Sequence, residues 1–170
     1  MVNTPTPAPH EPEWLHRHEH EPNPEPPPGG AAFAVQLAEQ PARLFTVATL
    51  RSLLFTTIHD CYIVSTGHGT SGPFSFGGVR LSDLLAAVLP AGATWEYADV
   101  ISSDGFGTRL TPAELAAAPA ERPPLLAYTI DGAPLTRQAG LVRLVVPTET
   151  DDALKQVKWI ARIEIRLAAA

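Results

Sequence analysis

The short spacing between strand-like segments is the feature that most constrains how this chain can fold. Phe33, Val35 and Leu37 recur at a period of two, as in a strand with one buried face. Five later segments also have strand-like composition or alternation: 54–65, 95–103, 125–130, 141–146 and 163–167. Short helices are predicted at 46–53 and 81–89, and some connections are too short to be crossovers. We therefore predict an α+β fold with a mixed, mainly β core and short helices, rather than a doubly wound sheet.

Local motifs indicate where some of these elements begin or turn. In Thr111-Pro-Ala-Glu114 the threonine can cap a helix, Pro112 suits the first helical position, and Glu114 can complete a capping box. The pair Asp131-Gly132 is typical of a two-residue hairpin turn. The residues 66–73, Thr-Gly-His-Gly-Thr-Ser-Gly-Pro, are dense in glycine and predict a loop.

The first thirty residues differ in composition from the rest. They hold nine of the 18 prolines and four of the six histidines, with few large apolar side chains. Burial in such a segment cannot offset the loss of chain entropy. We therefore predict a disordered Pro/His/Glu-rich tail over 1–30 and a single domain over 31–170. The tail histidines could chelate a divalent metal, although they lack the fixed geometry of a structural zinc site: His10, His16, His18 and His20.

Charge and composition exclude several classes of partner. Five glutamates against one arginine give the tail a charge of −4 out of the formal −6, so the rest of the chain is nearly neutral. A basic stripe is missing from the sequence, and no nucleic-acid partner is expected. No apolar run reaches 18 residues, and no membrane span is predicted. Cys61 is the one cysteine and cannot form an internal disulfide, and no export signal is visible, so a cytoplasmic location is expected.

Cys61 is the first candidate for chemistry. If 54–65 is extended, His59, Cys61 and Ile63 share one face, and a glycine-dense segment follows them. A thiolate beside a histidine and a loop is a candidate nucleophile or soft-metal ligand. A lone cysteine in a core strand can also be a small buried hydrophobe. The spacing leaves both interpretations open.

Two other groups could bind a ligand. The glycines of 67–72 would let the backbone approach an anion, with His68 as a donor, although a surface loop has the same composition. Lys155 and Lys158 would share one face if their segment is helical, and could then hold a phosphate or a pterin edge. An ordinary solvated charged face is the alternative for these lysines.

Five segments follow one another in a characteristic order. They are Phe-Gly-Gly-Val-Arg-Leu-Ser-Asp-Leu-Leu (76–85), Ser-Ser-Asp-Gly-Phe (102–106), Pro-Leu-Leu-Ala-Tyr-Thr-Ile-Asp-Gly-Ala-Pro-Leu (124–135), Gly-Leu-Val-Arg-Leu-Val-Val-Pro (140–147) and Lys-Gln-Val-Lys-Trp-Ile-Ala-Arg-Ile-Glu (155–164). In this order they resemble the molybdopterin-binding domain of the sulfite oxidase-like oxidoreductase family. The resemblance covers nearly all of residues 33–167.

The resemblance implies a sulfite-oxidase-like molybdopterin-binding fold that holds one molybdenum–molybdopterin cofactor. In that family a single cysteine after an early strand ligates molybdenum, and Cys61 stands in its place. The resemblance also implies that Lys155 and Lys158 lie near the pterin or its phosphate, and that the strand end at Asp104 borders the metal pocket. A further candidate role, tuning the metal or holding the pterin, falls to His59 or His68.

Three classes of function remain open. The leading hypothesis is a molybdopterin-dependent oxidoreductase that transfers electrons or oxygen atoms with a small polar substrate and an unknown redox partner. The second is a catalytically silent module that binds a pterin or a partner on the same fold. It is favoured by the carboxylates within 148–152, because like charges would weaken phosphate binding. The third is a hydrolase using Cys61 with His59 or His68, which lacks an identifiable orienting group.

Overall fold

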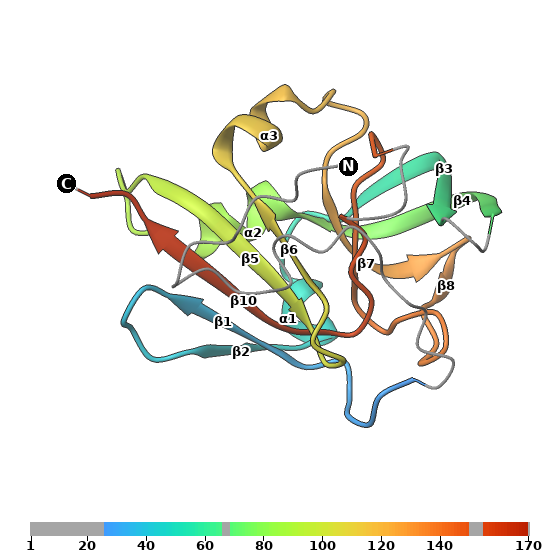
Figure 1. Cartoon of the computed structure of the whole chain (residues 1–170), viewed down its shortest axis with the longest axis horizontal. Coiled ribbons are helices and arrows are strands. Elements are labelled where there is room, and N and C mark those ends of the chain that lie inside the picture. The colour runs from blue at the N-terminus through green and yellow to red at the C-terminus, as the bar shows by residue number, and fades with distance from the viewer. Residues whose placement is uncertain (1–25, 66–68, 150–154, 170) are drawn as a thin grey trace, which may run out of the picture.

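Two β-sheets form the framework of the protein (Figure 1). The structure is a computed structural model and describes residues 26–65, 69–149 and 155–169. In spatial order, sheet A consists of β2 (Arg43–Phe45), β1 (Phe33–Leu37), β10 (Ile160–Leu167), β5 (Trp95–Ser102) and β6 (Gly107–Leu110). Sheet B consists of β3 (Thr56–Ser65), β4 (Gly69–Arg80), β7 (Leu125–Ile130) and β8 (Ala133–Pro134), with β9 (Arg143–Val145) also paired to β7. β1 and β10 run parallel, whereas the other pairs are antiparallel.

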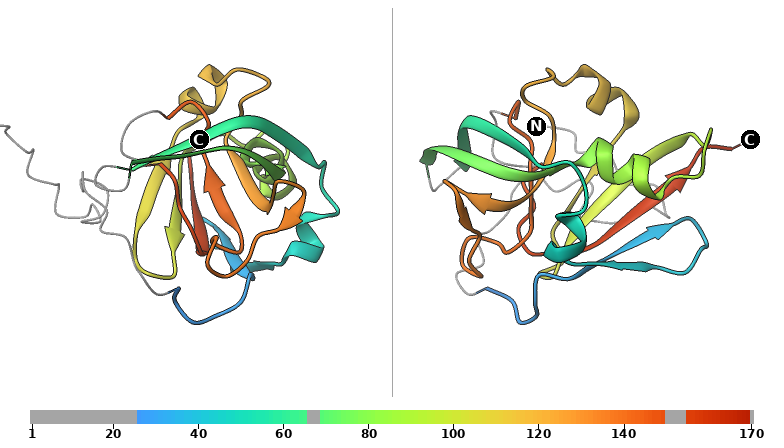
Figure 2. Two further views of the ribbon diagram at one scale, coloured as in Figure 1. Left: turned by 90° about the vertical axis from the view of Figure 1, so that its right-hand side faces the viewer. Right: turned by 180° about the vertical axis from the view of Figure 1, so that it is seen from behind.

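Three short helices connect the strands: α1 (Val47–Leu50), α2 (Leu81–Val88) and α3 (Pro112–Ala117). Seen from behind, α1 and α2 lie in front of the strands, and α3 lies at one end of the molecule (Figure 2). The predicted capping box of α3 is confirmed, because the Thr111 hydroxyl accepts from the Glu114 amide and the Glu114 carboxylate accepts from the Thr111 amide. The Asp131-Gly132 turn is also confirmed, with both residues at positive φ between β7 and β8.

The two faces of sheet B pack into different hydrophobic clusters. Along β7, Leu126 and Tyr128 join the main core, which also contains buried residues of sheet A and of α1 and α2. Leu125 and Ala127 alternate with them and belong to a second cluster. This second cluster contains seven buried residues: Ile58, Cys61, Phe76, Leu125, Ala127, Leu135 and Val145. We call the side of sheet B that carries it the outer face.

The predicted loop over 66–73 is wrong for its second half. Gly69–Pro73 belongs to β4, where Gly69 pairs with Ser65 and Ser71 pairs with Ile63 of β3. Glycine disfavours strands by local propensity, but pairing with a long neighbouring strand supplies the backbone hydrogen bonds. At Gly78 the strand needs a glycine, since a Cβ there would lie 2.0 Å from the Leu126 carbonyl oxygen of β7.

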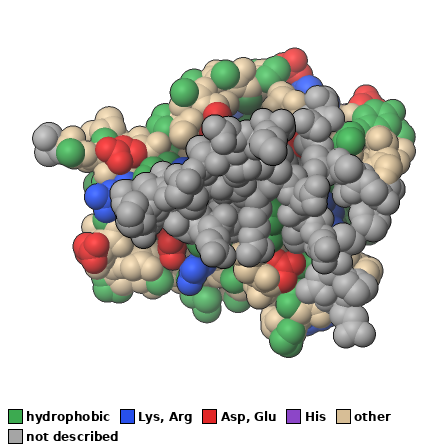
Figure 3. All heavy atoms as spheres, viewed as in Figure 1, with side chains coloured by type: hydrophobic (Ala, Val, Ile, Leu, Met, Phe, Trp, Pro, Cys, Tyr) green, Lys and Arg blue, Asp and Glu red, His purple; other side chains and the backbone are tan. Residues whose placement is uncertain are grey.

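The strand predictions are confirmed within a few residues at their ends, whereas β2, β4, β6 and β8 were not predicted. In β10 the predicted alternation holds for Ile163 and Ile165, which are buried, and for Arg162 and Arg166, which are exposed. No helix of the described residues is long and apolar enough to cross a membrane. On the described part of the face in Figure 3, lysines and arginines are scattered among acidic side chains rather than gathered in a stripe.

Candidate functional site

Cys61 lies in β3 and is completely buried in the cluster on the outer face of sheet B. Its Sγ donates a weak hydrogen bond to the carbonyl oxygen of His59, 3.7 Å away. Burial raises the pKa of the Cys61 thiol, and the Asp60 carboxylate adds to this shift. The Arg122 guanidinium opposes the shift through its charge and a hydrogen bond. In this state the thiol is protonated and packed as a hydrophobe, which agrees with the second interpretation of the sequence.

The prediction that His59 and Cys61 share one face is wrong. The pairing of β3 with β4 shifts register between Ile58 and Cys61, and Asp60 adopts a positive φ of 53°. This bulge breaks the period of two, so His59 is exposed while Cys61 points inward. The His59 ring bonds Ser75 instead, with 3.1 Å between Nδ1 and Oγ. The structure therefore does not form the Cys61–His59 pair that a hydrolase would need.

Arg143 is a buried charge on the same outer face. It stands in β9 opposite Ala127 of β7, and its guanidinium lies 5.4 Å from the centroid of the Phe76 ring. Nη1 donates to the Ala139 carbonyl oxygen, but Nε is buried without a hydrogen-bond partner. Burial lowers the pKa of Arg143 to about 10, so the side chain is still charged at neutral pH. A buried cation of this kind is costly unless an anion compensates it.

Lys158 adds a second cation beside Arg143. Its pKa is lowered by burial and by the charge of Arg143, whereas Asp104 raises it. Gly140 makes room for the stem of Lys158, because a Cβ there would lie 3.2 Å from the Cβ and Cγ of that lysine. Trp159 fixes this region, donating from its amide to the Gly140 carbonyl and accepting at its own carbonyl from the Ser103 amide. The structure thus brings together the predicted residues Lys158 and Asp104.

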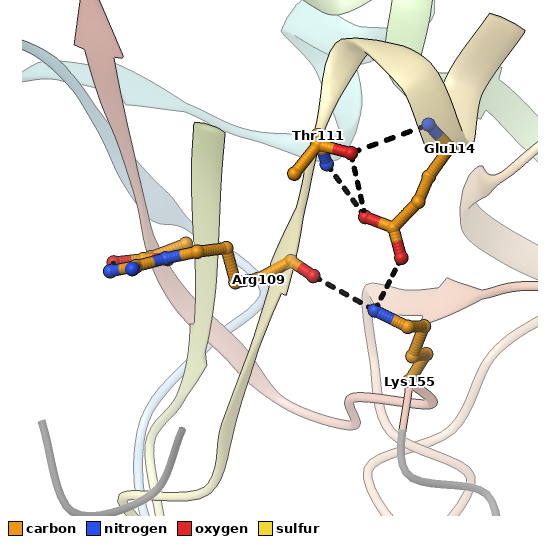
Figure 4. Close-up of polar contacts among 5 residues, drawn as sticks. Arg109, Thr111, Glu114 and Lys155 are labelled. Carbon is orange, nitrogen blue, oxygen red and sulfur yellow. Dashed lines mark hydrogen bonds and ion pairs between the residues drawn. The ribbon is translucent and has the colours of Figure 1, made fainter. Parts of the chain in front are cut away.

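Lys155 lies in a different polar cluster (Figure 4). Its Nζ is 2.7 Å from Glu114 Oε1 and donates to the Arg109 carbonyl oxygen at 3.0 Å. The segment 155–159 is not helical, so the condition for Lys155 and Lys158 to share a face is not met. A cavity of about 430 Å³ adjoins the ion pair, with mostly apolar walls that include Leu110 and Val146. This cavity suits a phosphate less well than the site at Arg143 does. The Lys155 ammonium is already paired with Glu114, whereas Nε of Arg143 lacks a hydrogen-bond partner.

Two predicted groups cannot be placed. His68 and the tail histidines lie outside the described residues. Among the residues that the structure does describe, no cluster of three or more His, Cys, Asp or Glu side chains could hold a metal ion.

The buried Arg143 and Cys61 on one face of sheet B, with the half-buried Lys158 beside Arg143, define a candidate site for an anionic, soft-metal cofactor. The family model described as "oxidoreductase molybdopterin binding domain" matches residues 36–169. The chain therefore belongs to this family, and molybdopterin is the cofactor that the domain binds. No curated protein matches the sequence.

A solved structure shows the same fold. The sulfane dehydrogenase SoxCD from Paracoccus pantotrophus aligns with a TM-score of 0.53 and 18% sequence identity. The alignment covers 79% of this chain and 38% of that chain, so the protein spans well under half the length of this neighbour. The predicted sulfite-oxidase-like fold, mostly β with few short helices, is confirmed.

Sequence reasoning missed Arg143 and Arg122. Arg143 sits within the apolar run Leu-Val-Arg-Leu-Val-Val of 141–146, where a charge is exceptional and requires a partner. That signal was available, but it does not say which strand face the charge occupies. Arg122 lies in a proline-containing loop after α3, and nothing in the local sequence indicates that it reaches β3.

Proposed function

We propose that this protein is a molybdenum–molybdopterin oxidoreductase domain in which Cys61 ligates the metal. The observation that carries the proposal is the buried Arg143, which lacks a partner at Nε and lies on the same face of sheet B as Cys61. The residues present fit the group: molybdopterin carries a phosphate, and Arg143 and Lys158 supply two partly or fully desolvated cations.

Each residue has a distinct part in this proposal. Arg143 and Lys158 hold the anionic end of the pterin, and Asp104 orients Lys158 by its charge. Cys61 would hold the metal as a thiolate, and the charge of the metal would offset the burial that raises the pKa of the thiol. When bound, the cofactor supplies electron or oxygen-atom transfer with a small polar substrate. The apolar side chains around Cys61, Phe76 among them, exclude water from the thiolate.

The other predicted residues enter the proposal more weakly. Lys155 would reach a cofactor only by leaving Glu114 and the Arg109 carbonyl. His59 would have to break its hydrogen bond with Ser75 before it could bind a cofactor. A redox partner is part of the proposed function, but no described surface identifies it.

The proposal is tested by expressing the chain in a host that makes the cofactor and measuring bound molybdenum and pterin. We expect about one of each per chain, and Cys61→Ser should lose molybdenum while circular dichroism stays nearly unchanged. Cys61→Ala is the matched control, because it also removes the ligand but introduces no buried hydroxyl. Unchanged molybdenum content in both variants would overturn the ligand assignment.

A catalytically silent module on the same fold is the second candidate. Two observations favour it: the thiol is fully buried, and Glu149 places a carboxylate just before the lysine pair. Well-folded protein that carries neither molybdenum nor pterin would support this function over the first.

A further inference from the structure

The orientation of Cys61 depends on an irregular piece of backbone. Register shifts flank it on both sides, between Ile58 and Cys61 and between Cys61 and Ile63. Asp60 has a φ of 53°, a left-handed conformation that is unfavourable for a residue with a Cβ. Such a bulge leaves backbone groups outside the regular ladder, and it persists only if other contacts hold it.

Arg122 supplies those contacts. From the loop between α3 and β7, its Nη1 donates to the His59 carbonyl oxygen at 3.0 Å. Its Nη2 donates to the Asp60 carbonyl at 3.4 Å and to the Pro147 carbonyl at 3.3 Å. One planar guanidinium therefore joins both bulge carbonyls to the residue two positions after β9.

The third of these contacts links two parts of the proposed site. β3 and β9 are not neighbours in sheet B, because β4 and β7 lie between them. Cys61 is on β3 and Arg143 is on β9. By binding the bulge and Pro147 at once, Arg122 sets the strand that carries the thiol against the strand that carries the buried cation.

We propose that Arg122 is a positioning residue that holds the His59–Asp60 bulge and thereby aims Cys61 Sγ at the metal. This inference rests on the proposed function. Arg122 does not touch the cofactor in this scheme; it acts on the thiol itself and on the two backbone carbonyls that precede it. A purely structural role would lower stability and weaken retention of the whole cofactor. A positioning role alters the metal-to-pterin ratio, because Arg143 and Lys158 still hold the pterin.

The test measures molybdenum and pterin in Arg122→Met, Arg122→Lys and wild-type protein purified from a cofactor-producing host. We expect Arg122→Met to keep its pterin and to lose about tenfold in molybdenum per pterin, the usual effect of removing an outer-shell partner. X-ray absorption of the remaining molybdenum should show one sulfur ligand fewer. Arg122→Lys should fall between the two, since an ammonium keeps the charge but cannot span three carbonyls.

Arg137→Met is the matched control. Arg137 also donates to a backbone carbonyl, that of Pro27 at 3.1 Å, and its described side-chain hydrogen bond lies away from β3. Its variant should keep the wild-type ratio. Parallel loss of molybdenum and pterin in Arg122→Met, or an unchanged ratio, would overturn the inference. If Arg122→Met does not fold, an unchanged ratio in Arg122→Lys overturns it. Wild-type protein without either component would instead refute the proposed function itself.

Discussion

Arg143 is a side chain that we expect to destabilise the cofactor-free protein and to be required for binding the pterin. Its guanidinium is fully buried with an unbonded Nε, and replacing such a charge by an apolar side chain of similar length often stabilises a protein. We predict that cofactor-free Arg143→Met is more stable than wild type by about 1–2 kcal/mol. The same variant should lose its pterin. Urea unfolding and pterin fluorescence measure the two effects.

Arg109→Met is the control for this prediction. Arg109 donates from Nε and Nη2 to both oxygens of the buried Asp99, at 2.7 and 2.9 Å. Removing it leaves a carboxylate that is 5% exposed without that pair, and should cost about 3 kcal/mol. If cofactor-free Arg143→Met is destabilised to a similar degree, Arg143 is a structural residue and not an anion site.

Lys158 gives the cofactor-free protein a characteristic pH dependence. Its folded pKa lies below the ordinary value of 10.5, so the unfolded chain binds more protons in the window between the two values. Stability should therefore rise with pH across that window. Arg143 and Asp104 face the ammonium with opposite effects, and burial is the main cause. Urea unfolding of wild type and Lys158→Met from pH 7 to 10.5 should show a larger rise in wild type, because Arg143 titrates in both proteins, and parallel curves would contradict this expectation.

At the scale of elements, α3 was predictable because its signals are local. Its capping box involves residues three apart, so the chain before folding already brings Thr111 and Glu114 close. The ion pair with Lys155 was not predictable, because it joins residues 41 positions apart by contacts that only the tertiary fold creates. The prediction for the β3–β4 hairpin was wrong for a related reason. Glycine density suggested a loop, and a period of two could not anticipate the bulge that turns His59 away from Cys61.

Glu114 allows the cap and the ion pair to be separated. Burial alone would raise its pKa, but bonds and charge from Lys155 and bonds from Thr111 lower it below 4.5. Glu114→Gln keeps the cap acceptor and should cost about 0.5 kcal/mol, a modest value because the pair is partly exposed. Glu114→Ala also loses the cap and should cost about 1 kcal/mol more.

The pH dependence of this difference checks its electrostatic origin. A carboxylate with a lowered folded pKa stabilises fully above its ordinary value, and that stabilisation is lost as the pH falls through the folded value. The difference in unfolding free energy between wild type and Glu114→Gln should therefore close as the pH falls below 4.5. If this difference in unfolding free energy does not change with pH, its origin is packing rather than charge.

At the scale of the whole molecule, the family and the fold class could be predicted because five motifs keep their order along the chain. The candidate site could be predicted only in part. Cys61, Lys158 and Asp104 were named, but the placement of Cys61 and Arg143 on one face depends on sheet B being buried on both faces. That burial depends on the strand order of sheet B, in which β4 and β7 lie between β3 and β9. No local sequence pattern specifies this order.

The division between tail and domain is the remaining prediction at this scale. Residues 1–25 lie outside the described structure, and Phe33 is the first buried core residue among those that are described. The described contact nearest the boundary is the bond from Arg137 to the Pro27 carbonyl. A chain that starts at Pro26 keeps this bond and every core residue of the described structure, so its unfolding free energy should stay within about 0.5 kcal/mol of the full chain.

The same truncation also tests the function of the tail. It removes four histidines and a charge of −4, but none of the cations at Arg143 and Lys158. Because the proposed cofactor contacts lie in the domain, molybdenum and pterin per chain should not change. Zinc binding at neutral pH should fall if the tail histidines chelate metal, and calorimetry with zinc alone measures it. Loss of pterin on truncation would show that the tail contributes to the cofactor site, and the domain would then have to be drawn from residue 1.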